Sequence, residues 1–279
     1  MTGTLAGGLL LGLASAGALG GGFALQHRGA VALPPLSLRR PLRSLGSLFR
    51  APLWLGGSVL GLSGWAAYIV ALRLAPLSLV QAASAGGIVV LALAGGRPSR
   101  RERVGVVAAL AGLAFLGLSL AGESGAGGAA PAREIVLWLA GSALAAAVVA
   151  GPGAARIAPG AGLGVAAGIL YAAGDVATKE AVAGGTHLFF VPAVLAASGL
   201  GFVALQLAFQ RGGRLATAGL ATLWTNALPI VAGTVVFAEP FPAGPAGVAR
   251  VASFCLVLAA GTLLARTEGP AAAAPVPVA

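Results

Sequence analysis

Long apolar runs, separated by short polar segments, follow one another along almost the whole chain. A transmembrane helix needs about 20 predominantly apolar residues to cross the hydrocarbon core of a bilayer. The pattern predicts nine such helices, at 3–25, 51–72, 75–95, 103–122, 134–152, 160–182, 187–210, 217–238 and 244–266. We expect the first run to be kept as a span, because no basic segment precedes it and it continues to Leu25. The predicted fold class is an all-α polytopic membrane protein.

The longest predicted connection covers residues 26–50, where Pro34, Pro35 and Pro41 are expected to break any regular element. A Gly/Ala-rich connector follows at 121–131, and the low-complexity segment after Glu268 is expected to be disordered. The resulting organisation is a first repeat at 1–122, a connector with the fifth helix at 123–159, a second repeat at 160–266 and a disordered tail at 267–279.

The composition agrees with a membrane location. The 279 residues are 58% hydrophobic and 9% charged, whereas about a quarter of the residues of a soluble domain are charged. The single cysteine excludes an intramolecular disulfide framework and a cysteine-based metal site. The formal net charge of +10 does not indicate nucleic-acid binding, because the basic clusters lie between apolar runs, as in the cytoplasmic loops of membrane proteins.

The distribution of basic residues predicts the orientation in the membrane. With the N-terminus outside, 13 of the 17 lysines and arginines fall on the cytoplasmic side, in agreement with the positive-inside rule. We therefore expect an N-terminus outside and a cytoplasmic C-terminus in a bacterial plasma membrane. The same basic side is expected to contact anionic lipids, at about 1 kcal/mol per residue.

The two halves of the chain resemble each other. A shift of 144 residues lays 74–120 on 218–264, and a shift of 152 lays the small-residue stripe of 8–20 on that of 160–172. The loop 97–103 carries four arginines and its counterpart 241–247 carries none. Loop charge that reverses between the halves is what an inverted-topology repeat requires. Such repeats are typical of transporters, whose substrate site lies near the midplane at the repeat interface.

Two segments resemble a known family. Residues 54–96, followed by RRERVGVVAALAGL, resemble the second to fourth helices of the drug/metabolite transporter superfamily, and 228–266 resembles the closing helix pair of its EamA-type members. The first helix end, FALQHRGA, and the nine spans are most similar to the branch with NIPA magnesium-transporter-like proteins. The resemblance implies a bundle of two inverted repeats around a central cavity. It leaves the substrate open among metabolites, drugs, nucleotide sugars and divalent ions.

Asp175 is the only aspartate of the chain and lies within the predicted span 160–182. Tyr171, Gly168 and Gly164 precede it by four, seven and eleven residues, which places all of them within about 40° on one helix face. Small residues let another helix approach, so Asp175 is expected to face protein or water and not lipid. One interpretation makes it the acid that binds substrate or couples transport to a gradient. The other pairs it with Lys179, one turn later.

Further candidates come from the predicted span 217–238, where Thr225 and Asn226 precede Pro229. The proline is expected to free a backbone carbonyl near Thr225, although a packing kink with Asn226 bonded to a neighbouring helix is the alternative. Gln81 and Ser84 lie at the matching depth of the other repeat, and the shift of 144 aligns Gln81 with Thr225. The predicted substrate-binding residues are Asp175, Tyr171, Gln81, Ser84, Thr225 and Asn226.

The sequence contains no recognisable catalytic, ATP-binding or cofactor-binding motif, so we expect neither an enzyme nor a cofactor. The leading hypothesis is a gradient-driven secondary transporter of a small solute, working by alternating access at a midplane cavity. The alternatives are a NIPA-like magnesium or divalent-cation transporter and a non-transporting membrane scaffold or lipid-binding protein. Expected partners are a small-molecule or ion substrate and anionic lipids. No nucleic-acid partner is expected, and formation of a homodimer is left as an open alternative.

Overall fold

A computed structural model describes residues 2–36, 41–74, 87–94, 98–120, 130–151, 159–181, 185–237 and 243–265, and within them every regular element is a helix. The α-helices are α1 (Thr2–Val31), α2 (Pro41–Phe49), α3 (Pro52–Leu74), α5 (Gly87–Leu93), α6 (Arg100–Leu120), α7 (Ala132–Ala150), α8 (Ala161–Ala181), α9 (Val191–Phe209), α10 (Leu220–Val235) and α11 (Gly244–Ala265). A 3-10 turn, η2 (Gly185–Phe190), leads into α9, and a π-helical turn, η3 (Leu215–Gly219), leads into α10.

Several of these helices are suited to a membrane. In the part of the chain that the structure describes, six helical segments are long and apolar enough to cross one: Ala6–Val31, Ala132–Ala150, Ala161–Thr178, Gly185–Phe209, Leu215–Gly233 and Gly244–Leu264. Helices α3 and α6 coincide with two more of the predicted spans. Helix α5 is the end of the predicted span 75–95, whose residues 75–86 lie outside the described part. The described part of the chain is thus all-helical and of integral-membrane type.

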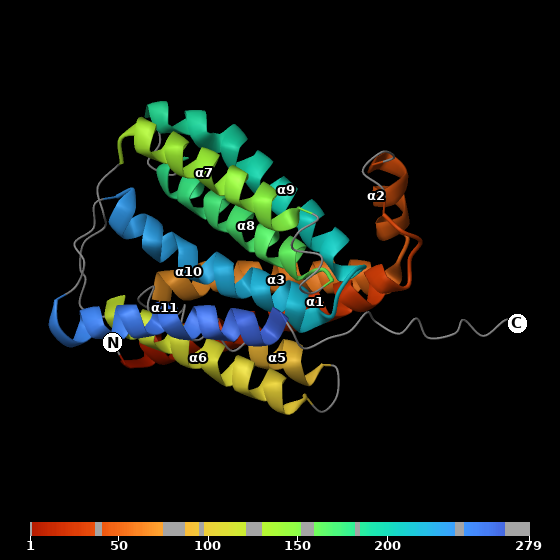
Figure 1. Cartoon of the computed structure of the whole chain (residues 1–279), viewed down its shortest axis with the longest axis horizontal. Coiled ribbons are helices and arrows are strands. Elements are labelled where there is room, and N and C mark those ends of the chain that lie inside the picture. Colours follow the sequence, from red (N-terminus) through yellow and green to blue (C-terminus); the bar gives the residue numbers. More distant parts are fainter. Residues whose placement is uncertain are drawn as a thin grey trace, which may run out of the picture.

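The helices pack in two sets (Figure 1). In the first set, α1 packs along α3 and also contacts α5, which in turn contacts α6. In the second set, α8 packs along α9 and α10, and α10 contacts α11. Helices α6 and α11 lie side by side and join the sets, while α7 covers the side of α8 turned away from them.

Glycines allow the closest of these contacts. A Cβ atom on Gly57 of α3 would lie only 2.6 Å from the carbonyl oxygen of Gly22 on α1. On α8, a Cβ on Gly164 or Gly168 would lie 2.6 or 2.7 Å from a backbone carbonyl oxygen of η3 or α10. Such close backbone approach is typical of small residues at helix interfaces in membranes. The prediction that the glycine stripe of 160–172 faces a neighbouring helix is confirmed.

The connection 26–50 is not the irregular loop that the prolines predicted. Helix α1 continues to Val31, and Pro41 begins α2. Proline is well tolerated in the first turn of a helix, where its missing N–H would have no intrahelical partner. Leu48 is buried, and the ring of Phe49 packs edge-on against Trp54, with 5.4 Å between the ring centroids. Apolar contacts with α3 therefore stabilise α2.

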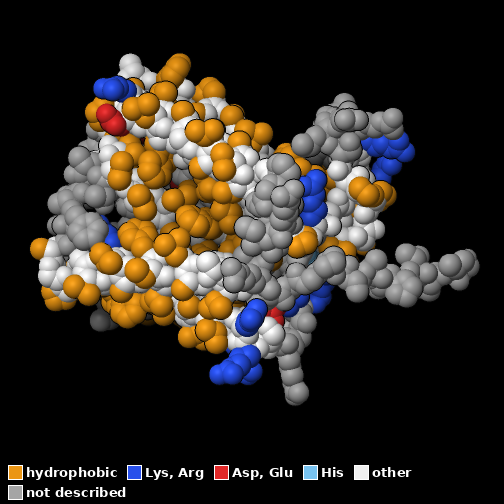
Figure 2. Space-filling view, viewed as in Figure 1, with side chains coloured by type: hydrophobic (Ala, Val, Ile, Leu, Met, Phe, Trp, Pro, Cys, Tyr) orange, Lys and Arg blue, Asp and Glu red, His pale blue; other side chains and the backbone are white. Residues whose placement is uncertain are grey.

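The basic side chains gather at one end of the helix bundle. This basic end is defined by the C-terminal ends of α1, α5 and α9 and the N-terminal ends of α3, α6 and η3, and it carries Arg28, Arg43, Arg50, Arg100, Arg101, Arg103, Arg211 and Arg214. Figure 2 shows most of the visible basic side chains there and fewer at the opposite end. Arg133 and Arg250 follow the N-terminal ends of α7 and α11 at that opposite end.

Candidate functional site

Asp175 lies on α8 with its side chain exposed, although both neighbours in the sequence are buried. Gly168 of α8 packs on α10, and a Cβ on Gly174 would meet Ser198 of α9. Because successive residues of an α-helix are about 100° apart around the axis, the direction of Asp175 falls between those of the two glycines. The opposite side of α8, with Ile169, packs against α7. Asp175 therefore points toward the space between α9 and α10.

The residues around Asp175 combine packing and polar roles. Tyr171, one turn earlier, is half-buried and packs against α9, since a Cβ on Gly201 would lie 3.2 Å from its ring. Thr178, three residues after Asp175, is exposed and donates its hydroxyl to the carbonyl of Gly174 at 2.8 Å. The threonine was missed by sequence reasoning, although its i+3 spacing from Asp175 could have indicated it.

The structure gives Asp175 no ion pair or hydrogen bond with the side chains that it describes. The side chain of Lys179, the predicted partner, lies outside the described residues, as do Gln81 and Ser84. Whether these two polar residues of the predicted first repeat approach Asp175 therefore stays a prediction. An acid in a membrane-spanning helix without a described partner is costly to keep, and acids kept in such positions usually have a function.

Thr225 and Asn226 on α10 are half-buried, and they differ in what they contact. The hydroxyl of Thr225 donates to the carbonyl of Gly168 at 3.4 Å, so it links α10 to the face of α8 that carries Asp175. Asn226 instead donates to Thr222 within its own helix at 2.7 Å. The structure describes no bond from Asn226 to a neighbouring helix, and that alternative stays a prediction. Helix α10 also stays regular through Pro229, so the proline does not interrupt it.

A buried polar network that sequence reasoning missed links the two helix sets. The indole N–H of Trp54 on α3 donates to the side-chain oxygen of Gln206 on α9 at 2.7 Å. The amide nitrogen of Gln206 donates to the oxygen of Gln26 on α1 at 3.3 Å. All three side chains are buried. Because buried polar groups are costly without partners, this network holds α1, α3 and α9 in one relative position.

A second network closes the basic end. Gln210, just after α9, donates to the carbonyl of Ala30 at 2.9 Å and accepts the backbone N–H of Leu36 at 2.7 Å. Ala30 belongs to the last turn of α1, where carbonyls have no intrahelical partner. Gln210 therefore caps α1 and fixes the chain that leaves it. No sequence motif predicts this contact, because Gln210 and Ala30 are 180 positions apart in the chain.

Two arginines at the same end contact the last turn of α5. Arg214 donates to the carbonyl of Leu91 at 2.6 Å, and Arg28 donates to that of Ala94. Cationic groups near a helix C-terminus are favourable for the helix dipole. His27, beside Arg28, bonds through Nε2 to the carbonyl of Gly212 at 2.9 Å, so its ring donates there. Together these contacts tie α1, α5 and the turn between α9 and η3.

A buried acid lies at the opposite end. Glu180, at the end of α8, is 2% exposed; it accepts the backbone N–H of Ala130 at 3.0 Å and contacts His187 Nδ1 at 3.0 Å. Within the described residues there is no group of three or more His, Cys, Asp or Glu that could hold a metal ion. Glu180 and His187 thus act as a structural pair that joins α8 to η2.

Comparison with protein-family models, with curated proteins and with solved structures finds no match to this chain.

Proposed function

We propose that this chain is a secondary transporter of the drug/metabolite type, which moves a small solute through a central cavity by alternating access. The observation that carries the proposal is Asp175: it is exposed within a membrane-spanning helix and points between α9 and α10. A charged side chain on lipid would cost at least about 2.5 kcal/mol. A water-filled cavity at this point removes that cost and gives the acid access to a solute.

The helix packing supports the proposed inverted repeat. The contacts of α1 with α3 and α5 correspond to those of α8 with α9 and α10, and the α5–α6 contact corresponds to that of α10 with α11. The shift of 144 residues, found in the sequence, carries Arg100, the first residue of α6, onto Gly244, the first residue of α11. On this assignment α7 is the connecting helix, and α5 belongs to the third of the nine predicted spans.

The two ends of the bundle support alternating access. Gly160 lies beside Gly212 at the basic end. Asp175 lies about 22 Å further along the axis of α8. The basic end is tied by Gln210, Arg214 and their partners. An acid that is exposed beyond a closed end is what an outward-open transporter would present. By the positive-inside rule the basic end is cytoplasmic, which puts the N-terminus outside.

A divalent-cation transporter is less favoured. Magnesium and calcium take several oxygen ligands, and Asp175 is the only acid that the described residues place on the face between α9 and α10. A single carboxylate suits a monovalent cation, a proton or a solute with one positive group.

The test is transport into liposomes by purified protein under an imposed proton or sodium gradient, with a panel of labelled metabolites and with a magnesium-sensitive dye. We expect uptake of an organic solute by the wild type and its loss in Asp175→Asn. Glu134→Gln, which removes one acid from the first turn of α7, is the matched control and keeps transport. Magnesium influx alone would favour the divalent-cation alternative. Equal transport by Asp175→Asn, or none by the wild type across the panel, would contradict the proposal.

A further inference from the structure

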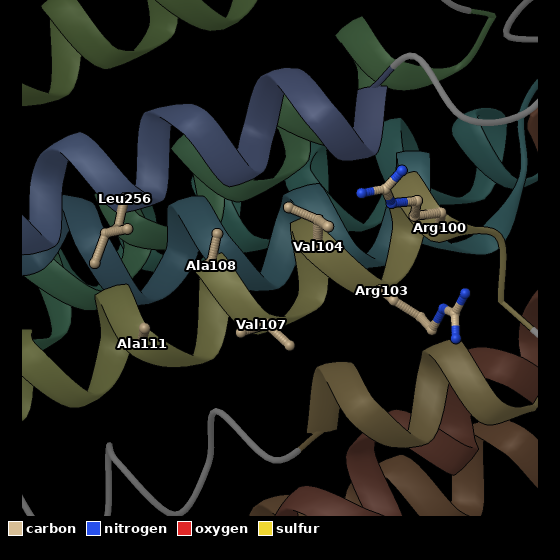
Figure 3. A pocket seen from close by; sticks show the side chains of 7 residues that line it. All are labelled: Arg100, Arg103, Val104, Val107, Ala108, Ala111 and Leu256. Atoms are coloured by element: carbon tan, nitrogen blue, oxygen red, sulfur yellow. The ribbon is translucent and has the colours of Figure 1, made fainter.

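The outer side of α6 carries a groove that the proposed transport mechanism does not use. The groove has a volume of about 610 Å³ and lies on the side of α6 shown in Figure 3. Its lining residues are Arg100, Arg103, Val104, Val107, Ala108, Ala111 and, from α11, Leu256. All of the lining side chains beyond the first turn of α6 are apolar, while both arginines lie at one end of the row.

The nearby acid, Glu102, bonds to the start of its own helix. Glu102 is buried and turned toward the start of its own helix, where it accepts the backbone N–H of Ser99 at 2.6 Å. The hydroxyl of Ser99 in turn accepts the backbone N–H of Glu102 at 3.2 Å, which completes a capping box. Arg100 and Arg103 are both exposed and line the groove, and Figure 3 shows their guanidinium groups pointing to different sides of α6.

The apolar part of the groove is exposed. Val104 is 50% and Val107 64% exposed, and Ala111, two turns beyond Arg103, continues the row. Between Arg103 and Ala111 the helix rises about 12 Å. An occupant therefore needs an anionic group at the arginines and an apolar chain that lies along α6 for at least this length. A phospholipid with an anionic headgroup combines the two, with its headgroup at the depth where Arg100 and Arg103 leave the membrane core.

We propose that this groove is a binding site for one anionic phospholipid, whose phosphate is held by Arg100 and Arg103 and whose acyl chain lies on Val104, Val107 and Ala111. Guanidinium groups bind phosphate oxygens by paired, charge-assisted hydrogen bonds. The α6–α11 contact joins the two helix sets, so a lipid bound along α6 stabilises this junction. The proposal needs only that the chain lies in a membrane and does not depend on the transported solute.

The test is native mass spectrometry of the protein in mild detergent, offered phosphatidylglycerol or phosphatidylcholine with the same acyl chains. We expect at least one retained phosphatidylglycerol, and binding of the order of thirtyfold weaker in Arg100→Gln/Arg103→Gln. Arg43→Gln/Arg50→Gln, which removes the same charge from exposed arginines at α2, keeps the wild-type affinity. Ala111→Phe fills the groove without a change in charge and weakens both lipids.

Four results would overturn the proposal: equal binding of the two lipids by the wild type, an equal loss in the control variant, unchanged binding in Ala111→Phe, and a protein dimer that Val107→Cys cross-links on this face in a Cys255→Ser background. The last result would assign the groove to a second copy of the chain. Should the double variant not fold, Arg103→Gln alone makes the same comparison with a smaller expected loss, of the order of fivefold.

Discussion

The indole nitrogen of Trp54 lies 2.7 Å from the side-chain oxygen of Gln206, 152 positions later in the chain. Because Gln206 also donates to Gln26, one amide joins three helices across the two halves of the molecule. The position of α9 relative to α1 and α3 thus depends on a polar contact as well as on apolar packing.

Replacement of Gln206 by leucine should destabilise the protein by about 1–2 kcal/mol, because the Trp54 N–H and the Gln26 oxygen then lose a buried partner. The measurement is reversible unfolding in mixed micelles. Ser63→Ala is the control, since the exposed hydroxyl of Ser63 bonds only within its own helix. A Gln206→Leu stability equal to that of the wild type would mean that water replaces the network.

Two adjacent glycines of α3 should respond in opposite ways to alanine. In Gly57→Ala the new methyl group would meet the backbone of Gly22, so α1 and α3 must separate, at a cost of about 1–3 kcal/mol. In Gly56→Ala nothing lies within 4 Å of the new methyl group, and the better helix propensity of alanine should stabilise by up to about 1 kcal/mol. Melting temperatures of the two variants, measured side by side in one detergent, check the prediction. A similar shift in both would disprove the close approach of α1 and α3.

Gln210→Ala should loosen the segment that follows α1. The backbone N–H of Leu36 loses its acceptor, and at about 1 kcal/mol for one hydrogen bond the segment should open about fivefold more often. Hydrogen exchange measured on a peptide that contains Leu36 detects this change. Arg211→Ala, an exposed neighbour, should leave the exchange rate unaltered. Faster exchange in both variants would point to a general loosening of the α9–η3 turn.

Asp175→Asn should leave the stability within about 0.5 kcal/mol of the wild type, because the structure describes no hydrogen bond or ion pair that the change would break. Thermal unfolding of the two proteins at the same pH is the measurement. A large loss of stability would show that Asp175 is held by a structural partner, such as Lys179, and that its exposure has no functional meaning.

The positions of the helices could be predicted from the sequence because apolar length and small-residue spacing are local properties. Each predicted span that the structure describes coincides with a helix, and the glycine stripe on α8 faces α10 as its periodicity indicated. The end of α1 was predicted six residues too early, since Gln26, His27 and Arg28 read as the start of a loop. Their side chains bond to other parts of the chain, so the polar residues do not end the helix.

The polar contacts that link the two helix sets could not be predicted, because each joins residues far apart in the sequence. Gln206 and Gln210 lie one helical turn apart, and this i, i+4 spacing was the only local indication that one side of α9 is polar. Of the six predicted substrate-binding residues, Asp175 and Tyr171 share a face of α8 and Thr225 contacts that helix. Asn226 donates a hydrogen bond within its own helix. Gln81 and Ser84 lie outside the described residues.

The length of α1 has a consequence for the surrounding bilayer. Its apolar segment Ala6–Val31 has 26 residues and is therefore about 39 Å long, whereas the hydrocarbon core is about 30 Å thick. The surplus of about 9 Å equals the last six residues, from Gln26 to Val31, and these are the residues that bond to α5 and α9. A thicker membrane would draw residues 26–31 toward the hydrocarbon core, and a thinner membrane would leave them among the headgroups. Hydrophobic mismatch therefore acts directly on the contacts that close the basic end.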